Sequence, residues 1–252
     1  MRKGHGRNNS AALNIVFEDN WLIVVEKPCG LLTMSTGRPG ETTAYSILTD
    51  IVKGRSGKGG GSSRIFIVHR LDRETSGLLV FAKDEMTKRR LQDNWEELVT
   101  ERKYTAVLEG WVDSEEGWIE SWLYENPQTL KMHCHAFEEG DTPETPPRKG
   151  WQYASTHCRT VKTGIYSGTR YTMTDFHLET GRKNQLRAHS SWIGHPITGD
   201  SRYGAATNPI GRLALHAAGL TLTHPHTGKR MTFRSNVPRS FRRLVSGQGD
   251  TE

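Results

Sequence analysis

The chain has 252 residues, with 34 Lys and Arg against 28 Asp and Glu, which gives a formal charge of +6 at pH 7. A chain of this length can bury a hydrophobic core without disulfide bonds. Its three cysteines, Cys29, Cys134 and Cys158, form no CxxC pair, which argues against a secreted disulfide scaffold. No run approaches the ~18 apolar residues of a membrane helix, so we expect a cytoplasmic protein with no membrane partner, and the basic balance favours a polyanionic partner without identifying it.

The N-terminal part of the chain predicts two short strands followed by a long loop. Residues 15–18 and 22–26 are apolar runs joined by a polar turn. Residues 53–63, "KGRSGKGGGSS", have the composition of a flexible surface loop, and we interpret them as a loop insertion. A nucleotide-binding phosphate loop is excluded there, because the Gly-Lys pair is followed by Gly and not by Ser or Thr.

The middle of the chain predicts buried strands and one amphipathic helix. Residues 65–68 and 78–82 are apolar without polar alternation, as expected for strands buried on both faces. Asp84 is a suitable N-cap for a helix over residues 85–100, whose apolar positions recur at helical spacing. A further strand is predicted over residues 103–112.

The second half predicts more strands and one helix around a polar segment. Residues 124–150 hold four of the ten prolines, so we expect irregular structure there, with one short strand near residues 131–137. The remaining predicted elements are strands at 152–160, 169–179 and 220–223, and a helix that starts near Arg182 and ends at Gly194 and Pro196.

The connection between the two buried strands, within "IVHRLDRETSGLLVFAK", is unusually polar. A carboxylate at the end of a buried strand can be held in a fixed geometry at low dielectric, as nucleophilic or general-base chemistry requires. Asp72 is therefore a candidate catalytic residue. Local spacing is equally consistent with a turn formed with Ser76 and Gly77, or with an ion pair to Arg70 or Arg73.

Five segments resemble, in order, the motifs of the RluA class of RNA pseudouridine synthases. Several ordered matches of many residues are a stronger signal than one short motif. The resemblance implies an α/β (α+β) fold, the pseudouridine synthase catalytic fold, with a long, mostly antiparallel mixed sheet flanked by helices. The segments are "VFEDNWLIVVEKPCGLLT", "HRLDRETSGLLVFAK", "RKYTAVLEG", "ETGRKNQLRAHSSWIGHPITGDSRYG" and "LALHAAGLTLTHPHTGKRMTFRSNVP".

The resemblance also sets the expected domain boundaries. Residues 15–243 are expected to form a single catalytic domain that includes the Gly- and Ser-rich insertion. Residues 1–14 are expected to be a basic, disordered tail, and residues 244–252 a C-terminal tail. Many relatives carry a small N-terminal RNA-binding domain, whereas residues 1–14 are the only ones that precede the first motif in this sequence. We therefore expect this chain to bind RNA with its catalytic domain and basic ends, and to act as a monomer.

The resemblance implies catalytic roles for three residues. Asp72 corresponds to the catalytic aspartate, Tyr104 to the active-site tyrosine, and Arg187 to an arginine that pairs with the aspartate. The aspartate either attacks the sugar or base as a nucleophile or removes the 2′ proton of the ribose to give a glycal, and the sequence does not choose between these routes. Either route requires an ionised carboxylate, which a neighbouring cation supports.

The resemblance implies substrate contacts as well. The ring of Tyr104 is suited to stacking on an extruded uracil, although an ordinary strand tyrosine would also occupy this position. Leu186 is expected to give the base an apolar floor, or to pack in the core. Arg70 could fill the space of the flipped nucleotide or bind a phosphate. The other expected substrate-binding residues are His69, Arg73 and Lys103.

Two departures from the family pattern concern residue 184 and the Gly-rich insertion. The third motif usually has His where this chain has Asn184, and we expect both departures to affect substrate contacts and not Asp72, Tyr104 or Arg187. No metal or cofactor is expected, because the His and Cys residues of "MHCHAF" and "HPH" lack the spacing of a convergent ligand set.

Two other classes of function remain as alternatives to an RNA pseudouridine synthase that acts on a stem-loop of ribosomal or transfer RNA. A noncatalytic RNA-binding or chaperone module could have the same fold, but the presence of Asp72, Tyr104 and Arg187 argues against it. A glycosidase or nuclease would need a second catalytic acid or a metal-binding carboxylate cluster, and neither is evident. Release of free base or cleaved RNA would identify that third class.

Overall fold

The computed structural model describes residues 13–55 and 64–246. The expected N-terminal tail, most of the Gly- and Ser-rich insertion and the last six residues lie outside the described residues. Within these ranges, eleven strands form one sheet. The strands are β1 (Asn14–Glu18), β2 (Leu22–Lys27), β3 (Phe66–Ile67), β4 (Ser76–Ala82), β5 (Val99–Glu109), β6 (Glu116–Glu125), β7 (Met132–Ala136), β8 (Gln152–Tyr166), β9 (Thr169–Leu178), β10 (Leu215–Thr223) and β11 (Arg230–Arg234).

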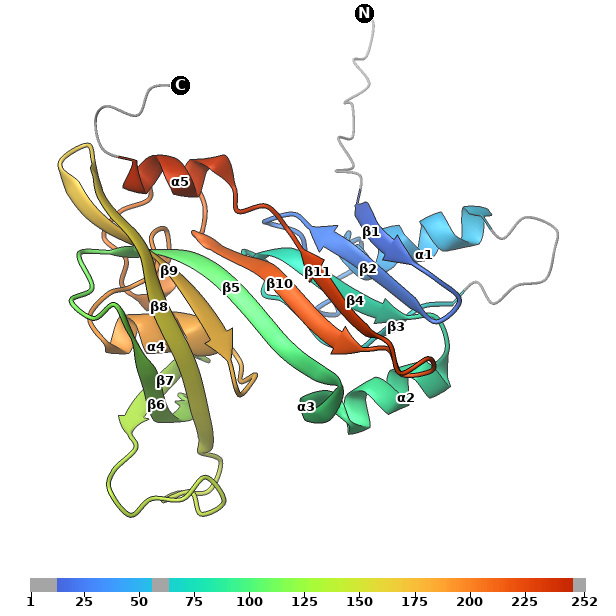
Figure 1. Ribbon diagram of the computed structural model, residues 1–252, viewed down its shortest axis with the longest axis horizontal. Helices are drawn as coiled ribbons and strands as arrows, with labels where there is room; N and C mark the ends of the chain where they lie inside the picture. Colours follow the sequence, from blue (N-terminus) through green and yellow to red (C-terminus); the bar gives the residue numbers. More distant parts are fainter. Residues whose placement is uncertain (1–12, 56–63, 247–252) are drawn as a thin grey trace, which may run out of the picture.

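Helices flank this sheet along its length (Figure 1). α4 contacts β6 and β7, and α5 packs on β8 and β9. The helices are α1 (Ala44–Arg55), α2 (Glu85–Asp93), α3 (Trp95–Leu98), α4 (Gln185–Trp192) and α5 (Arg239–Val245), with a short 3₁₀ helix at Ser201–Tyr203. The fold is therefore the predicted mixture of helices and a long, mostly antiparallel mixed sheet.

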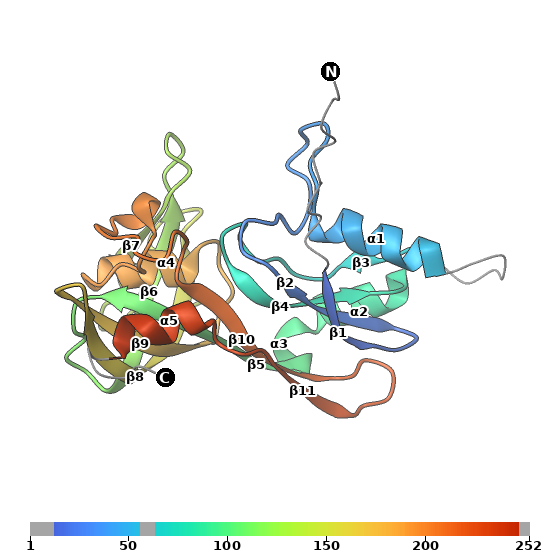
Figure 2. The same ribbon diagram turned by 90° about the horizontal axis from the view of Figure 1, so that it is seen from above.

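The order of the strands places chain segments that are far apart in sequence side by side. The order is β1-β2-β4-β10-β5-β9-β8-β6-β7, with β3 beside β4 and β11 beside β10. β4 and β10 are parallel, and the other pairings among the described strands are antiparallel. Figure 2 shows that β5 and β10 run through the middle of the molecule, between the half that carries α1 and the half that carries α4 and α5.

Gly77 permits the close approach of β4 to β10. Its backbone has φ +116°, and a Cβ atom there would lie 2.2 Å from the carbonyl oxygen of Ala217. Only glycine fits this position without moving the central strand, because it has no Cβ and tolerates positive φ. Gly77 is thus required for the parallel pairing that follows the candidate aspartate.

The sheet is covered on both faces in the half that contains β2 and β4. All seven residues of β4 are buried, which confirms the prediction of a strand without polar alternation. Leu79 and Phe81 pack with Leu48 of α1, whereas Leu78 and Val80, the alternate residues, belong to a cluster with Leu91 of α2.

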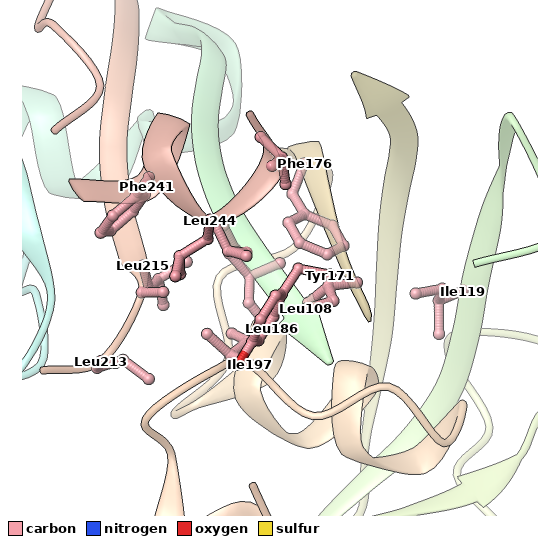
Figure 3. Packing of buried hydrophobic residues seen from close by; sticks show 14 residues of the cluster. Leu108, Ile119, Tyr171, Phe176, Leu186, Ile197, Leu213, Leu215, Phe241 and Leu244 are labelled. Atoms are coloured by element: carbon pink, nitrogen blue, oxygen red, sulfur yellow. The ribbon is translucent and has the colours of Figure 1, made fainter. Parts of the chain in front are cut away.

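A separate core lies in the other half of the sheet. Figure 3 shows side chains from β5, β9 and β10 meeting those of α4 and α5. The residues include Leu108, Tyr171, Phe176, Leu186, Leu215, Phe241 and Leu244. Leu244 and Val245, which the sequence placed in a C-terminal tail, are buried as the last residues of α5.

The helix expected over residues 85–100 ends earlier than predicted. α2 stops at Asp93, Asn94 has φ −119°, and its side-chain amide donates to the carbonyl oxygen of Arg90, which ends the helix. A single turn, α3, follows, and Val99 already begins β5. The β-branched pair at residues 99 and 100 favours the strand.

Other boundaries also differ from those expected. The strand predicted to reach residue 112 ends at Glu109, because Gly110 has φ +82°. The helix expected from Arg182 begins at Gln185, since Asn184 is left-handed. β10 begins at Leu215, five residues before its expected start. Five elements were not predicted at all: α1, β6, β11, α5 and the 3₁₀ helix at Ser201–Tyr203. Among the described residues, no helix has the length and apolar character to cross a membrane.

Two fully buried histidines are held neutral between hydroxyl groups. The ring of His189 lies 2.9 Å from the hydroxyl oxygens of both Ser121 and Thr156, and His216 is bounded by Ser76 and Ser235. Burial lowers the pKa of each imidazole to about 4. In the unfolded chain the same groups would protonate near pH 6.5.

We therefore predict that the protein loses stability as the pH falls from 6.5 towards 4. The unfolded state binds more protons than the folded state in that window, so the free energy of unfolding decreases with falling pH. From pH 7 to pH 5, the two histidines together should remove on the order of 3 kcal/mol. Urea unfolding at constant ionic strength would measure this loss.

Candidate active site

An open cavity of about 870 Å³ lies beside the loop between β3 and β4. Its lining comes mainly from the segment after β2, residues 67–75, β5 and residues 181–187 around the start of α4, with further residues from α2, α3, β9 and β10. Seven of the lining residues are basic and one is acidic. Those charged residues are Arg70, Arg73, Lys88, Arg102, Arg182, Lys183 and Arg187, with Asp72 as the acid. The cavity is thus suited to a negatively charged ligand.

The loop that carries Asp72 is fastened to the segment after β2 by the buried Lys27. Its ammonium group donates to the carbonyl oxygens of Pro28 (3.0 Å), Leu31 (2.7 Å) and Arg73 (3.1 Å). Burial lowers the pKa of Lys27 to about 8, so at neutral pH the amine is still mostly protonated and keeps three N–H donors. Buried carbonyl groups need hydrogen-bond donors, and the ammonium group of Lys27 supplies them to both segments. The loop that carries Asp72 is therefore attached to the segment after β2 through a buried side chain.

Further hydrogen bonds join the same two segments. The amide of Gly30 donates to the carbonyl oxygen of Arg73 (2.8 Å), and the Arg73 Nε returns a bond to the carbonyl oxygen of Gly30 (3.0 Å). The Thr33 hydroxyl accepts from the amide of Leu71 and donates to its carbonyl oxygen. Arg73 thus serves the backbone of the loop, although it also lines the cavity.

His69 has a structural contact at the start of this loop. Its Nε2 accepts a hydrogen bond from the amide of Val80 (3.1 Å), and its ring packs on Trp95, with 4.9 Å between ring centroids. Burial lowers the pKa of His69 to about 4, so the ring is neutral and can accept. Two of the polar side chains of this connection, His69 and Arg73, thus bind backbone groups.

Asp72 pairs with an arginine from α4 and not with its neighbours in sequence. Arg187 Nη1 lies 3.2 Å from Asp72 Oδ2, while Arg187 Nε and Nη2 bind the two oxygens of Asp200 at 2.7 and 2.8 Å. Burial alone would lower the pKa of Arg187, but the hydrogen bonds and charge of Asp200, followed by Asp72, raise it above its ordinary value. The guanidinium is therefore a permanent cation shared by two carboxylates.

Asn184 contacts the same carboxylate, contrary to expectation. Its Nδ2 lies 2.6 Å from Asp72 Oδ2, which makes the departure from the family pattern a direct neighbour of the candidate catalytic group. The sequence assigns Asn184 to the substrate contacts, because two residues so far apart in the chain cannot be identified as neighbours from the sequence alone. Asn184 belongs to the loop before α4, and 112 positions separate it from Asp72.

Tyr104 and Leu186 form the apolar part of the cavity. Tyr104 is partly buried and packs on hydrophobic clusters on both sides, and burial raises the pKa of its phenol to about 12. The hydroxyl therefore stays protonated across the physiological range. Leu186 lines the cavity and is 4% exposed, so it is a core residue as well as a possible floor for a ligand.

The structure brings Arg70 to the cavity but not Lys103. Arg70 is exposed and lines the opening. Alternate residues of a strand point to opposite faces, and Lys103 points away from the side of Tyr104, where its ammonium group lies 2.7 Å from Asp175. Arg102, two residues before Tyr104 on the same strand, lines the cavity instead, and this alternation was the signal that could have identified it.

Asp200 is the other residue that sequence reasoning missed. It lies inside the quoted segment "HPITGDSRYG" and is 2% exposed, with both oxygens bound to Arg187. An acidic residue in a buried turn is a signal for a hidden partner, since isolated charges are rarely buried. Among the described residues, no group of three or more His, Cys, Asp or Glu side chains is arranged to hold a metal ion.

Comparisons with known proteins point to one family. Residues 21–192 match the family described as RNA pseudouridylate synthase. The chain is 30% identical over 247 residues to "tRNA pseudouridine synthase C" of Salmonella typhi, covering 94% of this chain and 90% of that protein. It is 31% identical over 232 residues to "Uncharacterized RNA pseudouridine synthase YhcT" of Bacillus subtilis (strain 168), covering 92% and 71%.

A solved structure has the same fold. "Human RNA Pseudouridylate Synthase Domain Containing 4" superposes with a TM-score of 0.71 at 23% identity, covering 92% of this chain and 91% of that one. The similarity therefore extends over most of the chain and not only over the motif segments.

We predict that the pair formed by Arg187 and Asp200 supports the fold as well as the site. Arg187→Met should lower the free energy of unfolding by about 3–5 kcal/mol, because it leaves the buried Asp200 without a counter-charge. Adding Asp200→Asn to that variant should restore part of the loss, since the isosteric amide carries no charge. Urea unfolding of the parent chain, both single variants and the double variant gives the coupling energy. Additive effects of the two substitutions would contradict the pairing.

Proposed function

Since the chain belongs to the RNA pseudouridylate synthase family, and is therefore an isomerase, we propose that it converts one specific uridine of a transfer RNA to pseudouridine through Asp72. The observation that carries this proposal is the position of the carboxylate. Asp72 lies in a basic cavity, paired with Arg187 and near the ring of Tyr104 and the side chain of Leu186.

The reaction requires one bond to be broken and another to be formed within the same nucleotide. The bond between the ribose C1′ and N1 of uracil breaks, the base turns, and C1′ joins C5, which gives up its proton while N1 gains one. An ionised carboxylate can serve as the nucleophile or as the base that removes the 2′ proton. Both routes remain compatible with the contacts of Asp72, because each needs only one free carboxylate oxygen.

The remaining residues of the cavity have complementary tasks in this proposal. Tyr104 and Leu186 offer flat and apolar surfaces for a uracil turned out of its stack. The phenol of Tyr104, with its raised pKa, acts only as a protonated hydroxyl. Arg70, Arg102 and Lys183 line the cavity and provide positive charge for the phosphates of the RNA.

Transfer RNA is the proposed substrate class, with a stem-loop as the bound element. The support is that this chain covers 90% of a relative named tRNA pseudouridine synthase C. Ribosomal RNA is the alternative. We further propose that the chain from residue 15 to the end of α5, whose last residues Leu244 and Val245 are buried, acts as one catalytic domain. We also propose that the protein works as a monomer in the cytoplasm and that it needs no metal or cofactor.

We predict that Asp72→Asn abolishes pseudouridine formation while leaving RNA binding nearly intact. The amide has almost the same shape but can act neither as a nucleophile nor as a base, so turnover should fall roughly a thousandfold or more. Affinity should change less than about threefold, because phosphate contacts dominate it. Conversion of RNA and filter binding measure the two quantities. Asp113→Asn, at an exposed position between β5 and β6, is the matched control and should behave as the parent chain. Substantial conversion by Asp72→Asn would contradict the assignment.

We also predict that cells lacking the protein lose pseudouridine at a single position in one or a few transfer RNAs. Chemical mapping of pseudouridines in total RNA would locate the site, and expression of the parent chain, but not of Asp72→Asn, should restore it. Loss of a ribosomal RNA modification with unchanged transfer RNA would move the substrate to the alternative class. Addition of EDTA to the purified reaction should not change the rate.

A further inference from the structure

We propose that Asn184 is a positioning residue for Asp72, which fixes Oδ2 of the carboxylate and leaves Oδ1 as the oxygen that meets the substrate. This inference rests on the proposed function, because it concerns the same carboxylate. It assigns a separate role to each carboxylate oxygen of Asp72. It also gives a role to the side-chain amide of Asn184, a position at which this chain departs from the family pattern.

The two donors that reach Asp72 bind one oxygen. Asn184 Nδ2 lies 2.6 Å and Arg187 Nη1 3.2 Å from Oδ2. Oδ1 receives no side-chain or backbone hydrogen bond from the residues that the structure describes, and the Asp72 side chain is 31% exposed towards the cavity. One oxygen is thus an anchor, and the other keeps its lone pairs for a ligand.

The arginine alone does not fix the carboxylate. Arg187 gives its two shorter hydrogen bonds to Asp200, whose charge compensates that of the guanidinium. A single N–H remains for Asp72, and one contact allows a carboxylate to rotate about its own bond. The amide of Asn184 supplies the second contact, from another direction and at shorter distance, and this second contact defines the plane of the carboxylate.

Asn184 itself is held on two sides. Its backbone has φ +50°, in the left-handed region that Asn tolerates better than most residues. Its Oδ1 accepts from the hydroxyl of Tyr203 at 3.3 Å, and that hydroxyl accepts from the amide of Met132 at 3.1 Å. Because Tyr203 already accepts from an amide, its proton is directed to Asn184 Oδ1, which leaves Nδ2 facing Asp72.

The first test removes the amide without disturbing the backbone. Asn184→Gly accommodates φ +50° and deletes the side chain, so the loop before α4 keeps its conformation. We expect kcat to fall about ten- to hundredfold, since hydrogen bonds to charged groups and the orientation they impose have effects of this size. KM should stay within about threefold, because RNA phosphates are bound elsewhere. A rise in KM at unchanged kcat would make Asn184 an RNA contact and overturn the proposal.

The second test keeps the shape and changes the charge. Asn184→Asp is isosteric and puts a second carboxylate 2.6 Å from Asp72 Oδ2, so the two groups cannot both be ionised at low pH. Because Arg187 favours the ionised form of Asp72, the shared proton stays on the new carboxyl group, which can donate to Oδ2 as the amide does. We therefore expect kcat to be partly retained while the pair holds this proton and to fall, on an alkaline limb that the parent profile lacks, as the proton is lost. A side chain that served only the fold would not produce such an alkaline limb.

Asn20→Asp provides the matched control, because it makes the same chemical change in the exposed turn between β1 and β2. Its profile should coincide with that of the parent chain. If the parent chain converts uridine and Asn184→Asp shows the parent profile, the positioning role is wrong while the proposed function stands. If the parent chain converts no uridine in any RNA, the proposed function fails and this inference fails with it.

Discussion

The buried ammonium group of Lys27 holds together the two loops that form one wall of the cavity. It lies where β2 ends, and it binds carbonyl groups of both the segment after β2 and the loop that carries Asp72. A charged group in such a place needs partners on every side, and three carbonyl oxygens supply them. With this contact in place, the loop between β3 and β4 has few remaining conformations, and its single acidic side chain in the cavity is presented in a defined direction.

The sheet brings to that loop the partners it lacks in its own sequence neighbourhood. The parallel pairing of β4 with β10, which Gly77 permits, sets β5 two strands away from β4 and so places Tyr104 beside the loop. α4 then approaches from the far half of the sheet with Arg187 and, just before its first turn, Asn184. Asp200, buried behind them, balances the charge of the arginine. The site is therefore a junction between the two halves of one sheet.

The sequence predicted what depends on local pattern and missed what depends on distant contacts. The strands β1, β2, β4, β7 and β9 could be predicted from their apolar side chains, because a strand that is buried on one or both faces needs apolar residues at the buried positions. The unpredicted α1 had a readable pattern, since Ala44, Leu48 and Val52 recur at helical spacing, whereas the apolar residues at the start of β6 do not alternate, because Trp118 and Ile119 are adjacent. Asp200 and Asn184 could not be assigned in the same way, since their partners lie on other elements and only the folded sheet brings them together.

The central position of β10 has a consequence for the order in which the chain acquires its structure during synthesis. β10 is made after β1 to β9, yet it lies between β4 and β5 and pairs with both. Until the ribosome has released residues 215–223, the edges of β4 and β5 have no neighbour there, and the two halves of the sheet can form only separately. Such late, non-local pairing makes folding slow and leaves open strand edges exposed to other chains. Nascent copies of this protein therefore present the unpaired edges of β4 and β5 until β10 emerges.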